Sequence, residues 1–226
     1  MRTAIINLAN GRYIKGQERL KASLAAVGFT GDILPYQSIS QLKGCPDHQA
    51  QPYAFKTYAF KQAFNLGYDL VLWLDASVWA VKPVEGVFKK IEEQGYIMQE
   101  AGHYVGTWTN DRALDYFNIT RDEANTMLMY GNAGLLGLSK HNAIAMEFLY
   151  NWHEAAKNGI FAGSWNNQNN SESLSQDCKG HRHDMSVGSI IANALRMKYE
   201  SGNELLAYAA PEDKVNDKVI FKAQGV

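Results

Sequence analysis

Short apolar runs alternate along the chain with segments in which apolar residues recur at helical spacing. The short runs, bounded by turn residues, predict buried strands. The segments between them predict helices that end at Gly28 and Gly67, because glycine readily adopts the left-handed conformation of a helix end. The order of strand, helix and strand is typical of βαβ units and predicts an α/β fold with a parallel sheet. We expect strands at 3–8 and 32–36 and within the stretch 69–77, and helices at 17–27 and 55–64.

The second half of the chain continues the pattern less regularly. Thr120 and Glu123 match a capping box, which predicts a helix from 122 to 129. Ser139 is expected to cap a long helix. The apolar stripe of that helix comprises Ile144, Ala145, Phe148, Leu149 and Trp152. Further elements are expected at 84–93 (helix), 96–99 (strand), 130–138 (strand), 181–194 (helix, with Ala194 on its apolar face) and 219–221 (edge strand).

Composition and charge narrow the class of protein. The chain has 226 residues and a net charge of -1, so it fits one domain and gives no electrostatic reason to expect nucleic acid or an anionic membrane as partner. Cys45 and Cys178 lie far apart without CxxC spacing, which suggests neither a disulfide framework nor a zinc site. The sequence contains no signal peptide and no apolar run of roughly 20 residues, so we expect a soluble, cytoplasmic protein. The polar, low-complexity segment 163–177 is predicted to be a mobile loop.

Three polar clusters begin or end predicted buried elements. Asp75 and Ser77 lie at the carboxyl end of the stretch 69–77, the segment 132–134 precedes an apolar run, and the segment 181–184 opens the last helix. Ligands of open α/β sheets collect at the carboxyl ends of the strands, so Asp75 is the first candidate, with a turn or helix-cap role as the alternative. The His-x-His-Asp group formed by His181, His183 and Asp184 can bind a divalent metal. Its alternative is an ordinary N-cap with both imidazoles bonded to neighbouring backbone.

Two further segments suit close approach of a ligand. Asn132-Ala133-Gly134 places an amide beside residues with almost no side chain, although a tight strand entry would look similar. Asn10-Gly11-Arg12 follows the first strand and could shape a nucleotide-binding loop, although a lone glycine there is not a dinucleotide fingerprint. The motifs GxxxxGK[ST], GxSxG and HExxH do not occur in the sequence, which weakens the kinase-like, serine-hydrolase and zinc-protease interpretations.

Taken together, these segments resemble the nucleotide-sugar glycosyltransferases of the GT-A fold. The first strand and the loop at 9–13 look like the place where that fold holds the nucleotide base, and 68–77 looks like the strand that delivers its Asp-x-Asp motif. The segment 130–136 is similar to the Asn-Ala-Gly segment of glycogenin-like and galactosyltransferase-like members, and 180–190 is similar to the late His/Asp segment near the reacting sugar. The resemblance implies a single GT-A-like domain over 1–226, with a Rossmann-like, mostly parallel sheet flanked by helices.

The motif departs from the family's pattern at its second carboxylate. Asp-x-Asp is Asp75-Ala76-Ser77 here, and a hard cation prefers charged oxygen ligands to a hydroxyl. Three alternatives remain open. Asp75 with His183 or His181 holds Mn²⁺ or Mg²⁺, or lysine or arginine neutralises the diphosphate without a metal, or catalysis has been lost. Metal assistance ranks slightly ahead of the other two.

The resemblance implies a hexosyltransferase that moves a sugar from a nucleoside diphosphate sugar, in the first place a UDP-sugar, to a hydroxyl of a glycan or related acceptor. Asp184 would hold sugar hydroxyls or stabilise the oxocarbenium-like centre, and His183 would be a metal ligand or a proton carrier. Trp165, an aromatic residue expected to be exposed in the polar loop, is the candidate acceptor contact. The residues expected to bind nucleotide and sugar are Asn10, Gly11, Arg12, Asp75, Ser77, Asn132, Ala133 and Gly134.

Two other functions compete with transfer. A catalytically silent relative that binds sugar or nucleotide fits the missing second carboxylate. A nucleotidyltransferase that makes the sugar nucleotide would be expected to carry a glycine-rich, basic phosphate loop near the amino terminus. The segment 9–12 is too poor in glycine for such a loop.

Overall fold

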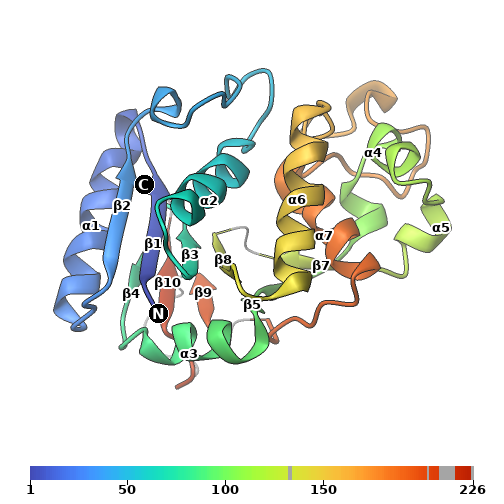
Figure 1. The fold of residues 1–226 in the computed structure, drawn as a ribbon. Helices are drawn as coiled ribbons and strands as arrows, with labels where there is room; N and C mark the ends of the chain where they lie inside the picture. The colour runs from blue at the N-terminus through green and yellow to red at the C-terminus, as the bar shows by residue number, and fades with distance from the viewer. Residues whose placement is uncertain (132–133, 203, 209–216, 225–226) are drawn as a thin grey trace.

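A five-stranded sheet lies at the centre of the computed structural model, which describes residues 1–131, 134–202, 204–208 and 217–224 (Figure 1). Its strands lie in the order β2 (Asp32–Tyr36), β1 (Thr3–Leu8), β3 (Leu70–Leu74), β8 (Leu135–Ser139) and β5 (Tyr96–Ile97). β1 pairs in parallel with β2 and β3, whereas β8 is antiparallel to β3 and to β5. The α/β prediction is confirmed, and an antiparallel pair of strands extends the parallel part of the sheet.

Helices cover both faces of this sheet (Figure 1). α1 (Ile14–Ala26) and α3 (Glu85–Gln94) pack on one face, and α2 (Phe55–Asn65), α6 (Ala143–Lys157) and α7 (His183–Ala194) build the core on the other. Successive side chains of a strand alternate between the two faces, so Leu72 joins the first core and Trp73 the second. Because both faces are covered, every residue of β3 is buried, which explains its continuous apolar run.

A smaller sheet forms beside the carboxyl end of β3. It has the order β4 (Val78–Ala80), β10 (Phe221–Ala223) and β9 (Leu206–Tyr208). β10 is antiparallel to β4 and parallel to β9. The edge strand predicted at 219–221 is therefore wrong in its bounds and in its place, because β10 is the central strand of this sheet. Its pairing joins residues far apart in the sequence, which no local pattern indicates.

A two-stranded antiparallel ribbon replaces part of a predicted helix. β6 (Gln99–Tyr104) pairs with β7 (Leu128–Gly131), so the strand predicted at 96–99 is divided between β5 and β6. Thr120 does form the predicted capping box with Glu123, but the helix it starts, α5 (Arg121–Ala124), ends after one turn. The prediction of a helix up to 129 is wrong because pairing with β6 takes residues 128–131 into a strand.

The start of α6 also differs from the prediction. Its N-cap is Asn142, whose side-chain oxygen accepts a hydrogen bond from the Ala145 backbone N–H at 3.0 Å, while Ser139 is the last residue of β8. The cap prediction at Ser139 is wrong because the strand continues to that residue. Ile144 is 41% exposed and Ala194 is exposed, so neither belongs to the core as predicted. The other members of the predicted α6 stripe are buried.

The polar segment 163–177 is organised around one side chain. The Asn167 amide nitrogen donates to the carbonyl oxygens of Ser173 and Cys178 at 2.9 and 3.1 Å, and its oxygen accepts from the backbone N–H groups of Glu172 and Ser173. The mobility of this segment stays a prediction. The remaining helices are α4 (Asp111–Tyr116) and the 3₁₀ turns η1 (Gly11–Tyr13), η2 (Ile39–Gln41), η3 (Val105–Trp108) and η4 (Gln168–Asn170).

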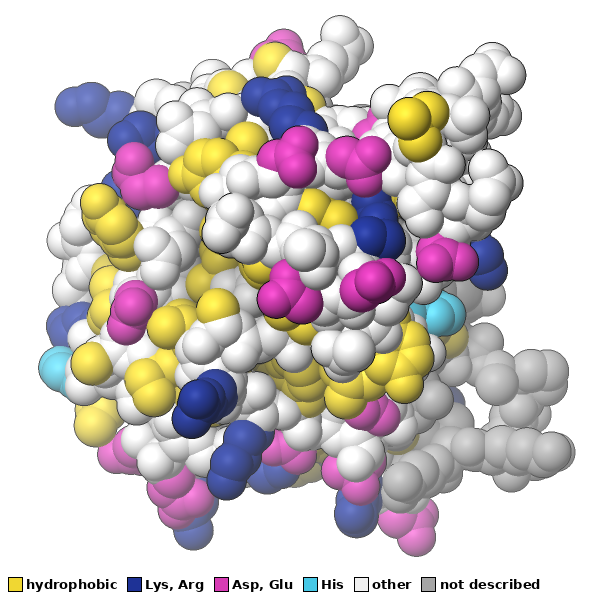
Figure 2. Space-filling model, turned by 90° about the vertical axis from the view of Figure 1, so that its right-hand side faces the viewer, with side chains coloured by type: hydrophobic (Ala, Val, Ile, Leu, Met, Phe, Trp, Pro, Cys, Tyr) yellow, Lys and Arg dark blue, Asp and Glu magenta, His cyan; other side chains and the backbone are white. Residues whose placement is uncertain are grey.

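The face on which α4 and α5 lie carries charges of both signs. Figure 2 shows this face, with acidic and basic side chains interspersed among apolar ones. The mixture agrees with the near-neutral net charge of -1 for the whole chain. Within the part of the chain that the structure describes, no helix combines the length and the apolar character needed to cross a membrane.

Candidate functional site

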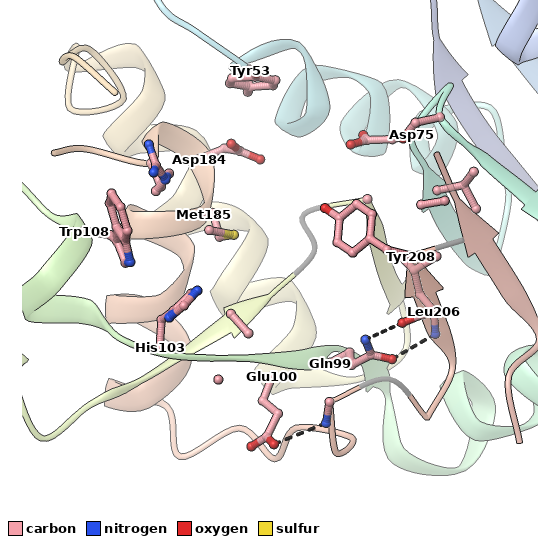
Figure 3. A pocket seen from close by; sticks show the side chains of 18 of the residues that line it. Tyr53, Asp75, Gln99, Glu100, His103, Trp108, Asp184, Met185, Leu206 and Tyr208 are labelled. Carbon is pink, nitrogen blue, oxygen red and sulfur yellow. Dashed lines mark hydrogen bonds between the residues drawn. The ribbon is translucent and has the colours of Figure 1, made fainter. Parts of the chain in front are cut away.

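A pocket opens at the carboxyl end of β3, bordered by the small sheet, the β6 strand and the start of α7 (Figure 3). Its volume is about 520 Å³, which lies within the range of small-molecule sites. Asp75 and Asp184 come from different elements and point toward each other across the pocket (Figure 3). The structure thus brings together described residues from all three polar clusters that the sequence singles out, because Gly134 also lines this pocket.

Asp75 is held at the rim by its neighbours in the sheet. It follows the last residue of β3, and its backbone N–H donates to the carbonyl oxygen of Gly134 at 3.0 Å. The indole nitrogen of Trp73 donates to Asp75 Oδ1 at 2.6 Å, and about a third of the Asp75 side chain, 35%, stays exposed. Its backbone carbonyl also accepts from Val78 N–H in a turn. The turn role predicted as an alternative is therefore real, and the carboxylate is directed into the pocket in addition.

A lysine that the sequence analysis did not select lies between the two carboxylates. Lys56, on α2, has a side chain only 3% exposed, and its Nζ lies 2.9 Å from Asp184 Oδ2 and 3.4 Å from Asp75 Oδ1. The ammonium also lies 5.3 Å from the ring centroid of Tyr53 and 5.5 Å from that of Trp73, so aromatic faces add to its stabilisation. The sequence alone gave no signal for this role, because lysine is mostly exposed in proteins, and the burial of Lys56 beside Ala59 is seen only in the folded chain.

Burial and charge act in opposite directions in this cluster. Burial raises the pKa of Asp184 to about 6, although the positive charge of Lys56 opposes the rise. Burial alone would lower the pKa of Lys56, but the negative charges of Asp184 and Asp75 outweigh it and the pKa is raised overall. Above about pH 6 Asp184 is therefore ionised, and the cluster places two acidic side chains around one ammonium. Its excess negative charge suits hydroxyl donors or a centre that becomes positive.

The two histidines predicted as metal ligands or proton carriers are buried and engaged elsewhere. His183 is 2% exposed and its Nδ1 lies 2.9 Å from the Phe161 carbonyl oxygen, while His181 Nδ1 accepts from the Asn110 backbone N–H at 3.3 Å. Burial lowers the pKa of both histidines, that of His181 to about 3. Neither contributes to the pocket lining, in contrast to Asp184 beside them.

A divalent metal does not fit the contacts of the described residues. Among them, no group of three or more His, Cys, Asp or Glu side chains could hold an ion. Asp75 and Asp184 instead face the Lys56 ammonium, which already supplies a cation between them. The predicted Mn²⁺ or Mg²⁺ site of Asp75 and His183 stays a prediction without support from these contacts, and we derive no step through a metal.

The predicted nucleotide loop lies outside the pocket. Asn10, Gly11 and Arg12 are exposed at η1, and Arg12 Nη2 donates to the Tyr13 hydroxyl at 3.1 Å. Gly11 has a φ of +52°, a conformation that favours glycine. Binding of a nucleotide by this loop stays a prediction.

The other predicted binding residues divide between the pocket and the part of the chain that is not described. Ser77 and Gly134 line the pocket, and a Cβ added at Gly134 would lie 3.5 Å from Asp75 Oδ2. Gly134 therefore keeps space open beside that carboxylate. Asn132 and Ala133 lie outside the described residues.

An arginine between two tryptophans forms another part of the wall. The Arg182 guanidinium carbon lies 3.7 Å from the ring centroid of Trp108 and 4.3 Å from that of Trp165. Trp165 is 50% exposed, as predicted, and it lines the pocket. Its contact with an acceptor stays a prediction. The sequence analysis did not select Arg182, although it lies between His181 and His183 in a cluster that it did select.

A buried glutamine fixes the small sheet against the pocket. Gln99 is 1% exposed, its amide nitrogen donates to the Leu206 carbonyl at 2.8 Å, and its oxygen accepts from the backbone N–H groups of Leu205 and Leu206 at 2.9 Å (Figure 3). A buried amide with these bonds satisfied adds rigidity to the site. A single glutamine after an apolar pair gave no sequence signal for this role.

Solved structures share the fold, whereas sequence comparisons find no relative. No protein family matches the sequence, and no curated protein is significantly similar to it. One similar structure is a glycosyltransferase involved in the glycosylation of the major capsid of PBCV-1, with a TM-score of 0.55 and 12% identity, covering 99% of this chain and 92% of that chain. Another is the WbbM bifunctional glycosyltransferase in its apo structure, with a TM-score of 0.54 and 9% identity, covering 92% of this chain and 40% of that chain. The predicted GT-A glycosyltransferase fold is confirmed, and the glycogenin-like or galactosyltransferase-like subtype stays a prediction.

Proposed function

We propose that the protein transfers a sugar from a nucleoside diphosphate sugar to a hydroxyl of an acceptor, and that the sugar reacts in the pocket beside Asp75 and Asp184. The observation that carries the proposal is the pair of carboxylates held on either side of the Lys56 ammonium at 3.4 and 2.9 Å. The fold shared with glycosyltransferases supports the same reaction class.

The charge of the cluster determines which part of the donor it suits. Cleavage at the anomeric carbon creates positive charge on the sugar ring and negative charge on the departing diphosphate. Two carboxylates and one ammonium leave an excess negative charge, which stabilises the ring and repels the diphosphate. We therefore place the sugar ring, rather than the diphosphate, next to Asp75 and Asp184.

Each residue of the cluster has its own part in this proposal. Asp184 accepts hydrogen bonds from sugar hydroxyls and stabilises the positive ring, and Asp75, which is more exposed, orients the sugar on the sheet side. Lys56 is a positioning residue, because its ammonium fixes the two carboxylates in place before the donor binds. Gly134 leaves room for the sugar beside Asp75.

The chain offers a matched pair of variants for testing the proposal, one at each end of β3. Asp75→Asn removes the charge in the pocket. Asp69→Asn makes the same change at the opposite end, where Asp69 pairs with Lys140 at 2.8 Å. Purified protein is incubated with a panel of UDP- and GDP-sugars and acceptor mixtures, and nucleotide release is measured. The panel is run with and without Mn²⁺.

We expect nucleotide release with at least one donor. The rate of release should fall about 100-fold in Asp75→Asn, as when one preorganised charge-stabilising group is removed, and should change little in Asp69→Asn. Equal activity in both variants would show that the pocket is not the reacting site. Binding of a sugar nucleotide without release under every condition would favour the silent binding relative, which Ser77 in place of the second carboxylate keeps as the second candidate function.

A further inference from the structure

Arg182 is clamped in the pocket wall with both faces of its guanidinium covered. Trp108 lies 3.7 Å from the guanidinium carbon and Trp165 lies 4.3 Å from it, each measured to the ring centroid. The backbone is fixed as well, because Arg182 N–H donates to Ser186 Oγ at 2.8 Å and to the Trp108 carbonyl at 3.1 Å. The clamp joins α7 to η3 and to the polar segment, so the guanidinium is held in one orientation.

Stacking leaves only the edge of the guanidinium for a ligand. All five N–H groups of arginine point outward in the plane of the group, where indole rings above and below do not block them. One of these donors is used within the protein, since Nη1 donates to the Trp165 carbonyl oxygen at 2.9 Å. Arg182 lines the pocket, so part of its remaining edge meets the ligand space.

The positive charge of Arg182 has no acidic partner in the described part of the chain. No carboxylate there lies within the 4.0 Å of an ion pair with it. Asp184, two residues further along α7, is paired with Lys56 instead, and so is Asp75. A stacked arginine with an open edge matches the geometry of a carboxylate or phosphate, which accept two parallel hydrogen bonds.

We propose that the edge of Arg182 is a binding subsite for an anionic group, a carboxylate or a phosphate, on a substrate of this pocket. Two oxygens of that group would accept hydrogen bonds from the guanidinium edge. The choice of ligands rests on the proposed function, because the anionic group then comes either from the donor diphosphate or from an acidic acceptor sugar. Trp108 and Asp184 lie across the pocket from Asp75, so the subsite is separate from the rim of β3 (Figure 3). The clamp explains why an arginine, rather than a lysine, occupies this position.

The equilibrium binding of two probe sets tests the subsite. Binding is measured by NMR titration at low and at high salt. UDP and inorganic pyrophosphate represent the donor diphosphate. Methyl glucuronide, compared with methyl glucoside, represents an acidic acceptor, because the two differ only in the carboxylate. Arg182→Gln removes the charged fork, Arg182→Lys keeps the charge without the planar fork, and Arg112→Gln is the control. Arg112 likewise donates to one backbone carbonyl, that of Asn158 at 3.3 Å, but lies outside the pocket.

We expect at least one probe set to bind the wild-type protein and to lose about 10- to 100-fold in affinity in Arg182→Gln, as for a hydrogen-bonded charged group. Arg182→Lys should recover only a small part of this loss, and Arg112→Gln should lose nothing. Weaker UDP and pyrophosphate binding identifies the donor as the source of the anion, and a lost preference for glucuronide identifies the acceptor.

The subsite is overturned if the wild-type protein binds glucuronide no better than glucoside and Arg182→Gln leaves UDP and pyrophosphate binding unchanged. It is also overturned if Arg182→Lys binds both probe sets as the wild-type protein does. Melting temperatures show whether the variants fold. The preference of the wild-type protein for glucuronide over glucoside tests, without any variant, whether the pocket binds an acidic acceptor. Because these probes need no turnover, a failure of the nucleotide-release assay and a failure of the subsite are distinguishable.

Discussion

Replacement of Lys56 by methionine should destabilise the protein strongly, and more at high pH than at low pH. Methionine keeps the unbranched, apolar stem and removes the ammonium that lies 2.9 Å from Asp184 and 3.4 Å from Asp75. The Asp184 side chain is only 4% exposed, so water replaces the Lys56 ammonium poorly in the variant. Removing one partner of a buried ion pair leaves an uncompensated charge and costs about 3–5 kcal/mol of unfolding free energy.

The pH dependence follows from the raised pKa of Asp184. This carboxyl has a pKa of about 6 in the folded protein and an ordinary value of 3.8, so the unfolded chain gives up its proton first as pH rises. The stability that the protonated form contributes is therefore present below about pH 4 and is lost as pH rises to about 6, a change of about 3 kcal/mol. Without Lys56 the pKa rises further, so the loss continues above pH 6 in the variant alone.

Urea unfolding at pH 5 and pH 8 measures this effect, with Asp184→Asn and the double variant completing a cycle. We expect Lys56→Met to cost about 3–5 kcal/mol at pH 8 and clearly less at pH 5. In the Asp184→Asn background the cost should fall, because the buried charge is gone and Asp75 remains partly solvated. A cost below about 1 kcal/mol at pH 8, or the same cost at both pH values, would refute a charge-coupled cluster.

Three further predictions concern packing, capping and acid stability. Gly188→Ala should lower the free energy of unfolding, measured by urea denaturation, by about 1–3 kcal/mol, because the added Cβ would lie 2.5 Å from Tyr130 Cε1. Asn142→Ala should cost about 1 kcal/mol in the same assay through loss of the α6 cap, whereas Ser139→Ala should leave α6 capped. Burial lowers the pKa of His181 from 6.5 to about 3, so the stability that the neutral imidazole contributes is fully present above pH 6.5 and is lost as pH falls toward 3. His181→Gln should make this acid-induced loss of stability shallower in acid titrations followed by circular dichroism.

Periodicity predicted the parallel core of the fold well, because burial on both faces leaves a direct trace in the sequence. β3 is buried at every position, and its apolar run ends at the residue where the pocket begins. The glycines after α1 and α2 also lie where predicted, and Gly28 and Gly67 have φ values of +81° and +87°. Local signals were sufficient for these elements because each is decided by its own residues.

The elements predicted incorrectly depend on partners far away in the sequence. β7 replaces the second half of a predicted helix because β6 pairs with it, and β10 becomes a central strand because β4 and β9 lie on both sides of it. Ser139 resembled a helix cap, but pairing with β3 extends β8 to that residue. Pairing energy between distant segments outweighs local propensity in each case.

By itself, the sequence determined the α/β class and the buried strand that Asp75 follows, and it singled out Asp184 as a candidate site residue. Those features follow from hydrophobic pattern and from charges placed at the ends of buried elements. Only the tertiary structure decided which groups meet in the pocket, because Lys56 on α2 and Arg182 at the start of α7 become recognisable once their neighbours are known. Their chemistry depends on burial and on contacts between segments tens of residues apart, and these arise only when the chain is folded.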